Sequence, residues 1–573
     1  MYSIYRIWIR LFSNSLKDFI PGRAISIHGP SPLECIIYWA SLKPNSQSFH
    51  SHFLIFKVYE LLNRSHHEKN SKVFFFFGRK DSKVLIPQQM VNLGKLKFLS
   101  RSFAALSSAP LRICVVGSGP AGFYTAEKLL KAHEGVEVDI IDRLPTPFGL
   151  VRSGVAPDHP ETKVVINQFS RVAQNERCSF YGNISLGSSI SLAELREMYN
   201  AVVLSYGAES DRSIGIHGEE LAGIHAAREF VWWYNGHPDC RNLTPDLKSS
   251  DTAVILGQGN VALDVARVLL RPTTELARTD IACHALAALE GSFIRRVFLV
   301  GRRGPVQASW TAKELREILG IKDLAIHIQQ ADLVTTLADE IEMKNNRIRK
   351  RVYELLSKVA NPGTSPLCNQ RELHFVFFHR PEKFLESDDK SGHLAGVRLE
   401  KTILKGDDGQ TKQVAVGTGV YEDISCGIAL KSIGYKSLAI DGLPFDNHKG
   451  IVPNIEGRVL ANVSQDESKF DAGLYVCGWL KRGPTGIIGT NLYCAEETLA
   501  CISDDISKGV LTSDSSKPGG QGLLQLLDSR RIVVVPFSGW ERIDAEERRR
   551  GSLKGKPRQK LTTWEELLEV GCA

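Results

Sequence analysis

The clearest pattern of apolar and polar residues in this chain is a short apolar strand, then a glycine-rich loop, then a helix. It occurs as RICVVGSGPAGFYTAEKLL, residues 112–130, and again as VILGQGNVALDVARVLL, residues 254–270. Both strands are continuous runs of β-forming apolar residues, which is typical of strands buried on both faces of a parallel sheet. The repeat predicts an α/β fold with two Rossmann-like dinucleotide-binding domains and parallel sheets.

The first loop has the spacing Gly117-x-Gly119-x-x-Gly122. In such loops the first glycine makes the turn, the second lets a pyrophosphate approach the backbone, and the third lets the helix pack against the strand. The next strand ends at Asp142, where a carboxylate can accept hydrogen bonds from an adenosine ribose. Because the acid favours an unphosphorylated ribose, this loop predicts FAD or NAD.

The second loop, Gly257-x-Gly259-x-x-Ala262, is followed after one more strand by Arg302 and Arg303. These arginines stand where an NAD site would have its ribose acid. Two guanidinium groups can bind a 2′-phosphate through bidentate, charge-assisted hydrogen bonds, so this loop predicts NADPH. Two dinucleotide sites in one chain indicate a converter, in which a nicotinamide gives a hydride and a flavin releases single electrons.

The distribution of charge argues against nucleic-acid binding. The formal net charge is +7, but residues 1–110 hold 15 basic and 5 acidic residues, a surplus of +10. The rest of the chain therefore carries −3, and the basicity belongs to an N-terminal extension rather than to a binding face.

The N-terminal extension, residues 1–110, shows no motif over residues 1–89, and we expect it to be disordered. Residues 90–109, MVNLGKLKFLSRSFAALSSA, are basic, rich in serine and leucine, and lack acids. That composition predicts an organellar presequence and a location in the mitochondrial matrix, with the chloroplast as the alternative.

Eleven cysteines are scattered without a C-x-x-C pair, which excludes the common structural zinc spacings and a dithiol redox centre of that kind. We expect no metal site. No apolar run reaches the ~20 residues that span a bilayer, so we expect no membrane-spanning segment; peripheral association with a membrane stays open.

Several longer stretches match one known family. They are DRLPTPFGLVRSGVAPDHPETK, VVLSYGAE, GQGNVALDVAR, VGRRGPVQASWTAKELRE, SIGYKS, GWLKRGPTGIIGTN and VVPFSGWERIDAEERRRG. In this order, from about Arg112 to the C-terminus, they resemble the adrenodoxin reductase family of mitochondrial NADPH–ferredoxin oxidoreductases. The resemblance implies an FAD enzyme that takes a hydride from NADPH and passes single electrons to a two-iron, two-sulfur ferredoxin.

The resemblance also implies which residues contact the cofactors. For FAD these are Gly117, Gly119, Ala121, Gly122, Asp142, Leu150, Leu186 on the following strand, Trp479, Gly486, Ile487 and Ile488. For NADPH they are Gly257, Gln258, Gly259, Asn260, Val261, Arg302, Arg303, Glu314 and Gly486. From the residues alone, Trp479 either stacks on the flavin or is an ordinary core tryptophan.

Two further residues resemble a catalytic pair of the family, His159 in APDHPE and Asp264 in NVALD. We expect them to position the cofactors or to conduct a proton, because hydride transfer itself needs no acid–base residue. An acidic ferredoxin is expected to dock on a basic face formed by Arg316, Arg347, Lys350 and Arg351.

The expected domains are an FAD domain made of residues 111–211 and 437–573, with an NADPH domain, residues 212–436, inserted between them. Disulfide reductases of the same class need a C-x-x-C pair, and electron-input subunits usually carry cysteine clusters; neither is present. The alternatives that stay open are a flavin-binding NADPH sensor and a reductase with a different electron acceptor. The choice of ferredoxin, the downstream pathway, the redox potential, the oligomeric state and the true start codon do not follow from the sequence.

Overall fold

The computed structural model describes residues 25–28, 33–41, 52–60, 72–77, 110–360, 370–406, 413–461 and 470–573. The chain divides into two units, residues 1–106 and 107–573. In the first, four antiparallel strands follow one another in the order β1 (Ile25–His28), β2 (Leu33–Ser41), β3 (His52–Glu60) and β4 (Lys72–Phe77). The presequence, residues 90–109, lies outside the described residues. Most of residues 1–110 do too, so their disorder stays a prediction.

The second unit contains an eight-stranded sheet in the order β20-β21-β22-β8-β5-β6-β7-β23. Its five central strands are parallel, and β20, β21 and β23 pair antiparallel at the edges. The strands are β5 (Leu111–Val116), β6 (Val136–Ile141), β7 (Cys178–Gly182), β8 (Ala201–Leu204), β20 (Asn454–Ile455), β21 (Arg458–Leu460), β22 (Phe470–Val476) and β23 (Val535–Pro536).

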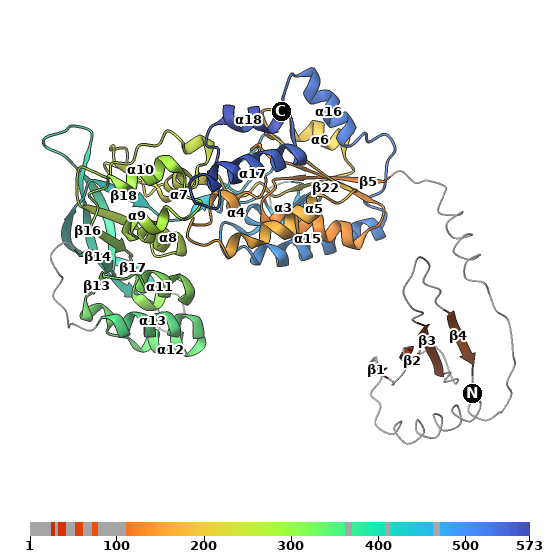
Figure 1. Ribbon diagram of the computed structural model, residues 1–573. Coiled ribbons are helices and arrows are strands. Elements are labelled where there is room, and N and C mark those ends of the chain that lie inside the picture. The colour runs from red at the N-terminus through yellow and green to blue at the C-terminus, as the bar shows by residue number, and fades with distance from the viewer. Residues whose placement is uncertain are drawn as a thin grey trace. The chain divides into compact units, whose positions relative to one another are not determined.

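Strand β5 shows why the central strands of this sheet are apolar. Ile113 and Val115 face one hydrophobic core, whereas Cys114 and Val116 face another on the opposite side of the sheet. Both faces are therefore buried, and a strand in this position cannot alternate between apolar and polar residues. Helices cover both faces (Figure 1).

The second large sheet has six strands, all parallel, in the order β10-β18-β11-β12-β14-β13. They are β10 (Ile224–Ala226), β11 (Thr252–Leu256), β12 (Arg296–Val300), β13 (Leu324–Ile328), β14 (Arg371–Val376) and β18 (Ile428–Lys431). The prediction of an α/β fold with two parallel Rossmann-like sheets is confirmed.

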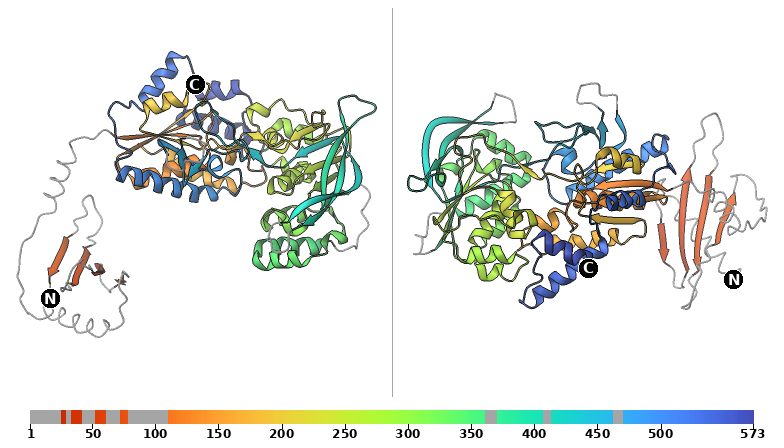
Figure 2. Two further views of the ribbon diagram at one scale, coloured as in Figure 1. Left: turned by 180° about the vertical axis from the view of Figure 1, so that it is seen from behind. Right: turned by 90° about the horizontal axis from the view of Figure 1, so that it is seen from above.

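A three-stranded antiparallel sheet, β15 (His379–Glu386), β16 (Leu394–Lys405) and β17 (Val414–Ser425), covers one face of the six-stranded sheet. Its Phe384, Val397 and Leu399 pack against Val254 and Leu256 of β11. Figure 2 shows these teal strands at the end of the second unit that lies away from α16. No local sequence pattern predicted this sheet.

The chain crosses from one large sheet to the other twice, and the two connecting segments pair with each other. Strand β9 (Ser210–Asp211) pairs antiparallel with β19 (Tyr435–Lys436). The strands of the eight-stranded sheet come from residues 111–204 and 454–536, and those of the six-stranded sheet from residues 224–431. The domain limits drawn from the sequence stay a prediction.

The helices of the second unit pack against these sheets. They are α3 (Pro120–Ala132), α4 (Leu150–Ser153), α5 (Ile166–Ala173), α6 (Leu192–Met198), α7 (Ala227–Asn235), α8 (Asn260–Leu270), α9 (Thr273–Leu276), α10 (Cys283–Glu290), α11 (Ala312–Leu319), α12 (Leu337–Asn345), α13 (Arg347–Val359), α14 (Trp479–Arg482), α15 (Thr490–Ser507), α16 (Gly520–Ser529), α17 (Phe537–Ser552) and α18 (Trp564–Cys572), with short 3-10 turns η2 (Thr162–Val165), η3 (Pro238–Cys240), η4 (Pro305–Gln307) and η5 (Gln330–Leu333). Among the described helices, none has the length and apolar character needed to cross a membrane.

A buried ion-pair cluster fixes the C-terminal segment to α4. The Glu547 side chain of α17 is fully buried, and its carboxylate accepts hydrogen bonds from Arg152 at 2.5 and 3.0 Å and from Arg558 at 3.1 Å. The backbone N–H of Leu561 donates to the same carboxylate at 2.9 Å. Because removing one partner leaves buried charges unpaired, such clusters tolerate substitution poorly.

We expect Glu547→Gln to lower the free energy of unfolding by about 3–5 kcal/mol, because two arginines lose their shared counter-charge. Thermal unfolding of the cofactor-loaded protein measures this. The matched control is Glu546→Gln, one residue earlier on the same helix, where the carboxylate pairs with Arg549 and Arg550 at the surface. Equal midpoints for the two variants would contradict the assignment.

Candidate functional site

The first glycine loop follows β5 and depends on close backbone contacts. Gly117 has a φ of +104°, and a Cβ there would lie 2.7 Å from the Ser205 carbonyl group. A Cβ on Gly122 would lie 1.9 Å from the Gly117 carbonyl oxygen. The first and third glycines are therefore required by the turn itself and by the packing of α3 on the strand.

The second glycine of this loop has space around it instead. A Cβ on Gly119 would meet nothing within 4 Å, and Gly119 is the N-cap of α3 without any side-chain cap. The free N–H groups and the dipole of a helix N-terminus favour an anion. This open, uncapped turn fits the pyrophosphate of FAD.

The carboxylate of Asp142 is hydrogen-bonded to the first glycine loop. It accepts hydrogen bonds from the backbone N–H of Ser118 at 2.7 Å, from the Ser118 hydroxyl at 2.5 Å and from the backbone N–H of Leu144 at 2.9 Å. The acid is thus fixed beside the first loop, and its contact with a ribose stays a prediction.

Two later segments of the chain meet the first loop. A Cβ on Gly478, just before α14, would lie 2.5 Å from the Cβ of Ala121, and a Cβ on Gly149, just before Leu150, would lie 3.0 Å from the Cα of Gly119. The structure therefore brings Ala121, the start of α4 and the start of α14 together.

Trp479 and Leu186 are two of the FAD contacts that the family resemblance implies. The Trp479 ring packs against Tyr435, with ring centroids 5.7 Å apart, so its stacking on a flavin stays a prediction. The expectation that Leu186 lies on a strand is wrong, because β7 ends at Gly182 and Leu186 only bridges to Ile190 in the following turn. Gly187 has a φ of +97°, and a turn there ends the extended chain.

The loop after α14 contains Gly486, Ile487 and Ile488. Ile487 is 65% exposed, and Gly486 has a φ of +85°. Arg482, at the end of α14, donates through Nη2 to Asn491 at 3.3 Å, while its Nε and Nη1 are buried without a hydrogen-bond partner in the described part of the chain. Buried donors normally have an acceptor, so this position suits the polar groups of a ligand such as FAD.

The second glycine loop repeats the first. Gly257 has a φ of +136°, and a Cβ there would lie 2.1 Å from the Ser432 carbonyl oxygen. A Cβ on Gly259 would meet nothing within 4 Å, and Gly259 is an N-cap of α8 without a side-chain cap. Ala262 is fully buried where the helix meets the sheet. Asn260 accepts a hydrogen bond from the backbone N–H of Thr311 at 2.9 Å, which ties this loop to α11.

Arg302 and Arg303 lie between β12 and η4, beside the second loop. Arg302 is exposed and Arg303 is partly buried, and neither forms an ion pair with a carboxylate among the residues described. Gln258 of the second loop lies over Gly301, where a Cβ would be 1.8 Å from the amide carbon of Gln258. Two guanidinium groups without counter-charge beside an uncapped helix N-terminus fit the 2′-phosphate and pyrophosphate of NADPH.

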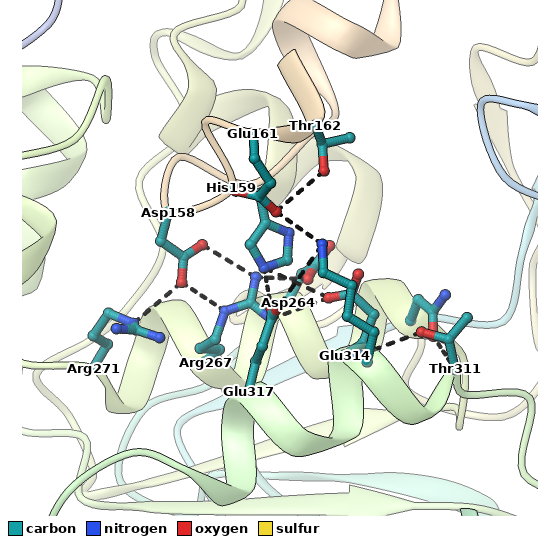
Figure 3. A network of polar contacts seen from close by, with 12 residues as sticks. Asp158, His159, Glu161, Thr162, Asp264, Arg267, Arg271, Thr311, Glu314 and Glu317 are labelled. Atoms are coloured by element: carbon teal, nitrogen blue, oxygen red, sulfur yellow. Dashed lines mark hydrogen bonds and ion pairs between the residues drawn. The ribbon is translucent and has the colours of Figure 1, made fainter. Parts of the chain in front are cut away.

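A polar network joins the loop before η2 to helices α8 and α11 (Figure 3). Its centre is Arg267 of α8, a fully buried guanidinium that donates to Asp158 at 2.6 and 3.1 Å and to Asp264 at 2.8 Å. His159 contacts Glu317 through Nε2 and lies 3.6 Å from Glu314.

The same network places the two predicted catalytic residues close to each other. No direct hydrogen bond between His159 and Asp264 occurs in the described residues; each instead belongs to the cluster around Arg267. Glu314 has one carboxylate oxygen, Oε2, that is buried without a hydrogen-bond partner in the same part of the chain. Burial raises the pKa of the Asp264 carboxyl from 3.8 to about 6, although the charge of Arg267 opposes this shift.

The predicted docking residues are exposed on two neighbouring helices. Arg316 lies on α11, and Arg347, Lys350 and Arg351 lie on the first turns of α13. The basic run therefore lies on a helix. Helices α11 and α13 pack against each other, as Figure 1 also shows.

Comparison with known proteins identifies the family. Residues 115–179 match an NAD(P)-binding Rossmann-like domain. The chain is 66% identical to the mitochondrial NADPH:adrenodoxin oxidoreductase of Arabidopsis thaliana over 472 residues, which is 82% of this chain and 97% of that protein. The chain belongs to the adrenodoxin reductase family. The human protein of the same name is 49% identical over 80% of this chain and 91% of its own.

A solved structure of this family has the same fold. Mycobacterium tuberculosis FprA in complex with NADPH aligns with a TM-score of 0.74 at 38% identity, over 81% of this chain and 100% of FprA. Our reductase is thus an NADPH-dependent FAD flavoprotein that transfers electrons. The mitochondrial names of the plant, human and fish relatives confirm the predicted localisation.

Several residues of this reductase's site were missed by sequence reasoning. They are Asp158, Arg267, Glu317 and Arg482. Arg267 lies three residues after Asp264 on the same face of the otherwise mostly apolar α8, and this spacing was the available signal. Glu317 is three residues after Glu314 on the same helix, so the helical repeat could have indicated it.

We expect Gly119→Ala to yield folded reductase that binds FAD at least about tenfold more weakly, because a methyl group would occupy the approach to the pyrophosphate without touching protein. The ratio of flavin to protein absorbance, with circular dichroism as the folding check, measures this. Gly135→Ala, at another glycine whose Cβ would meet nothing within 4 Å, is the control. Full FAD content in Gly119→Ala would place the pyrophosphate elsewhere.

We expect Asp264→Asn to change how stability depends on pH. The folded protein holds the Asp264 proton up to about pH 6, whereas the unfolded chain releases it near 3.8, so the wild type loses stability as pH rises between these values. Asparagine stays neutral and lacks this loss. The variant should therefore match the wild type near pH 4 and unfold a few degrees higher at pH 7, a gain of up to about 3 kcal/mol.

The measurement is the unfolding midpoint of the FAD-loaded protein from pH 4 to pH 8. Asp389→Asn, at an exposed position, serves as the control. A constant difference between wild type and Asp264→Asn across this range would mean that Asp264 does not titrate there.

Proposed function

We propose that this reductase takes a hydride from NADPH and passes single electrons to a small, acidic two-iron, two-sulfur ferredoxin, as the first enzyme of a mitochondrial electron-transfer chain. The observation that carries the partner assignment is the exposed cationic run Arg347, Lys350 and Arg351, with Arg316 on the neighbouring helix. A basic face beside the nucleotide domain attracts an acidic protein and orients it. Several relatives are named NADPH:adrenodoxin oxidoreductase, and adrenodoxin is a ferredoxin of this kind.

The residues that we propose to hold the cofactors lie in and around the two glycine loops. The first loop would hold FAD: Gly119 would bind its pyrophosphate and Asp142 its adenosine ribose. Trp479 and the loop of Gly486, Ile487 and Ile488 would contact its ring, and Leu150, Leu186, Gly117, Ala121 and Gly122 would flank it. Bound FAD accepts a hydride and releases electrons one at a time.

NADPH lies on the second loop. Its pyrophosphate faces Gly259, Asn260 and Val261, with Gly257 and Gln258 at the turn. Arg302 and Arg303 bind the 2′-phosphate, and NADH binds more weakly because it has no 2′-phosphate to accept their hydrogen bonds. Glu314 and Gly486 lie toward the nicotinamide end.

His159 and Asp264 act as positioning residues. Through Arg267 and Asp158 they join α8 of the NADPH side to the loop of the FAD side, and so hold the two cofactors in register. The Asp264 carboxyl, whose pKa is raised to about 6 by burial, is also suited to hold the proton that accompanies reduction of the flavin.

The test is cytochrome c reduction by NADPH, with and without an adrenodoxin-type ferredoxin, at low and high salt. We expect a strong dependence on ferredoxin that weakens at high salt. The triple variant Arg347→Ala, Lys350→Ala, Arg351→Ala should raise the KM for ferredoxin about tenfold at low salt and flatten the salt dependence.

The control is Arg548→Ala with Arg549→Ala on α17, which removes two exposed arginines elsewhere. If NADPH reduces the flavin but ferredoxin changes nothing, the cofactor assignment stands and the acceptor is a different one. If ferredoxin accelerates the reaction equally in the triple variant and the wild type, the docking face lies elsewhere.

A further inference from the structure

The basic run at the start of α13 contains a fourth cation that does not share the exposure of the others. Arg349 stands about 200° around the helix from both Arg347 and Arg351. Its side chain is 31% exposed and forms an ion pair with Glu342 of α12, whose side chain is 28% exposed. Arg349 therefore faces the inside of the α12–α13 hairpin.

Glu342 connects this arginine to the Arg302–Arg303 loop. The amide nitrogen of Gln307 donates to the Glu342 carboxylate at 3.0 Å and to Asp339 at 2.7 Å. Gln307 ends η4, which begins two residues after Arg303, and both α12 and α13 pack against η4. Arg349 thus lies on the face of the hairpin that meets the predicted 2′-phosphate site.

Positive charge exceeds negative charge around Arg349 and the Arg302–Arg303 loop. Three guanidinium groups, those of Arg302, Arg303 and Arg349, are accompanied by the carboxylates of Glu342 and Asp339. Asp339 is already used by Thr336, whose backbone N–H and hydroxyl donate to it at 2.9 and 2.8 Å. Burial and the charge of Arg302 lower the pKa of Arg303, and the charge of Arg349 lowers it further.

A cluster with an excess of positive charge is stabilised by an anion, and a phosphate monoester carries about −1.5 to −2 near pH 7. The 2′-phosphate of NADPH is such an anion. Glu342 competes with it for Arg349, because the N–H groups that donate to the Glu342 carboxylate cannot donate to the phosphate at the same time.

We propose that Arg349 is a third guanidinium of the 2′-phosphate site, and that it exchanges Glu342 for the phosphate when NADPH binds. This rests on the proposed assignment of Arg302 and Arg303. NADH leaves the Arg349–Glu342 pair in place, so Arg349 determines specificity between the two nucleotides without contacting the nicotinamide.

The experiment titrates the purified FAD-loaded protein with 2′,5′-ADP, which carries the 2′-phosphate, and with 5′-ADP, which lacks it, by calorimetry. Arg349→Ala should weaken 2′,5′-ADP binding about tenfold and leave 5′-ADP binding unchanged. Arg349→Lys should recover only part of the loss, because an ammonium group cannot form the bidentate contact. In steady state, Arg349→Ala should raise the KM for NADPH and leave kcat unchanged.

Glu342→Gln is the second, opposite test. Removing the competing carboxylate should strengthen 2′,5′-ADP binding several-fold, and a merely structural role of the Arg349–Glu342 pair would weaken it. Lys358→Ala, which removes an exposed cation from the last turn of the same helix, is the control and should change neither affinity.

The outcomes separate this inference from the site on which it rests. If Arg303→Ala weakens 2′,5′-ADP binding and Arg349→Ala does not, the NADPH site stands and the role of Arg349 is overturned. An equal loss of 5′-ADP binding in Arg349→Ala also overturns it, since the effect would then be structural. If Arg302→Ala and Arg303→Ala leave 2′,5′-ADP binding intact, the proposed NADPH site itself is wrong.

Discussion

Both nucleotide loops depend on the same close contact, in which the first glycine of the loop packs against the end of the neighbouring parallel strand. Gly117 meets the carbonyl of Ser205 just after β8, and Gly257 meets that of Ser432 just after β18. In each sheet this neighbour lies on the side of the loop strand opposite to the next strand in sequence. The loop therefore emerges where the strand order reverses, which leaves the helix N-terminus open to a phosphate. Any side chain at these glycines would push the loop off this position.

A second dependence is the joint between the two halves. Arg267 is fully buried, yet its three nitrogens face carboxylates from both sides of the joint. An isolated buried guanidinium would be costly, so the joint needs the Asp158 carboxylate and an oxygen acceptor at position 264 to form. Hydride transfer between two cofactors requires a fixed separation, and this cluster adds a second contact between the two halves to that of the paired strands β9 and β19.

How much of this could be predicted from the sequence depends on whether the signal is local. Strands β5 and β11, both loops, Arg302, Arg303 and the helix over Arg347 follow from short spacings, because a strand, a turn and a helix each have a local pattern. The antiparallel sheet β15–β17 and the partners of Arg267 depend on contacts between segments far apart in the chain. Leu186 was misplaced because a turn that ends an apolar strand can itself be apolar.

The basic run at residues 347–351 shows that spacing in the sequence does not tell which cations share a face of the helix. In RIRKR the four cations are almost adjacent in sequence, and composition alone treats them as one patch. The helix separates them, with Arg347, Lys350 and Arg351 facing solvent and Arg349 facing Glu342. One turn of α13 thus presents cations both to solvent and to the inside of the α12–α13 hairpin. Because both faces belong to one turn, a shift of this helix would move the proposed docking charges and the proposed nucleotide-binding charge together.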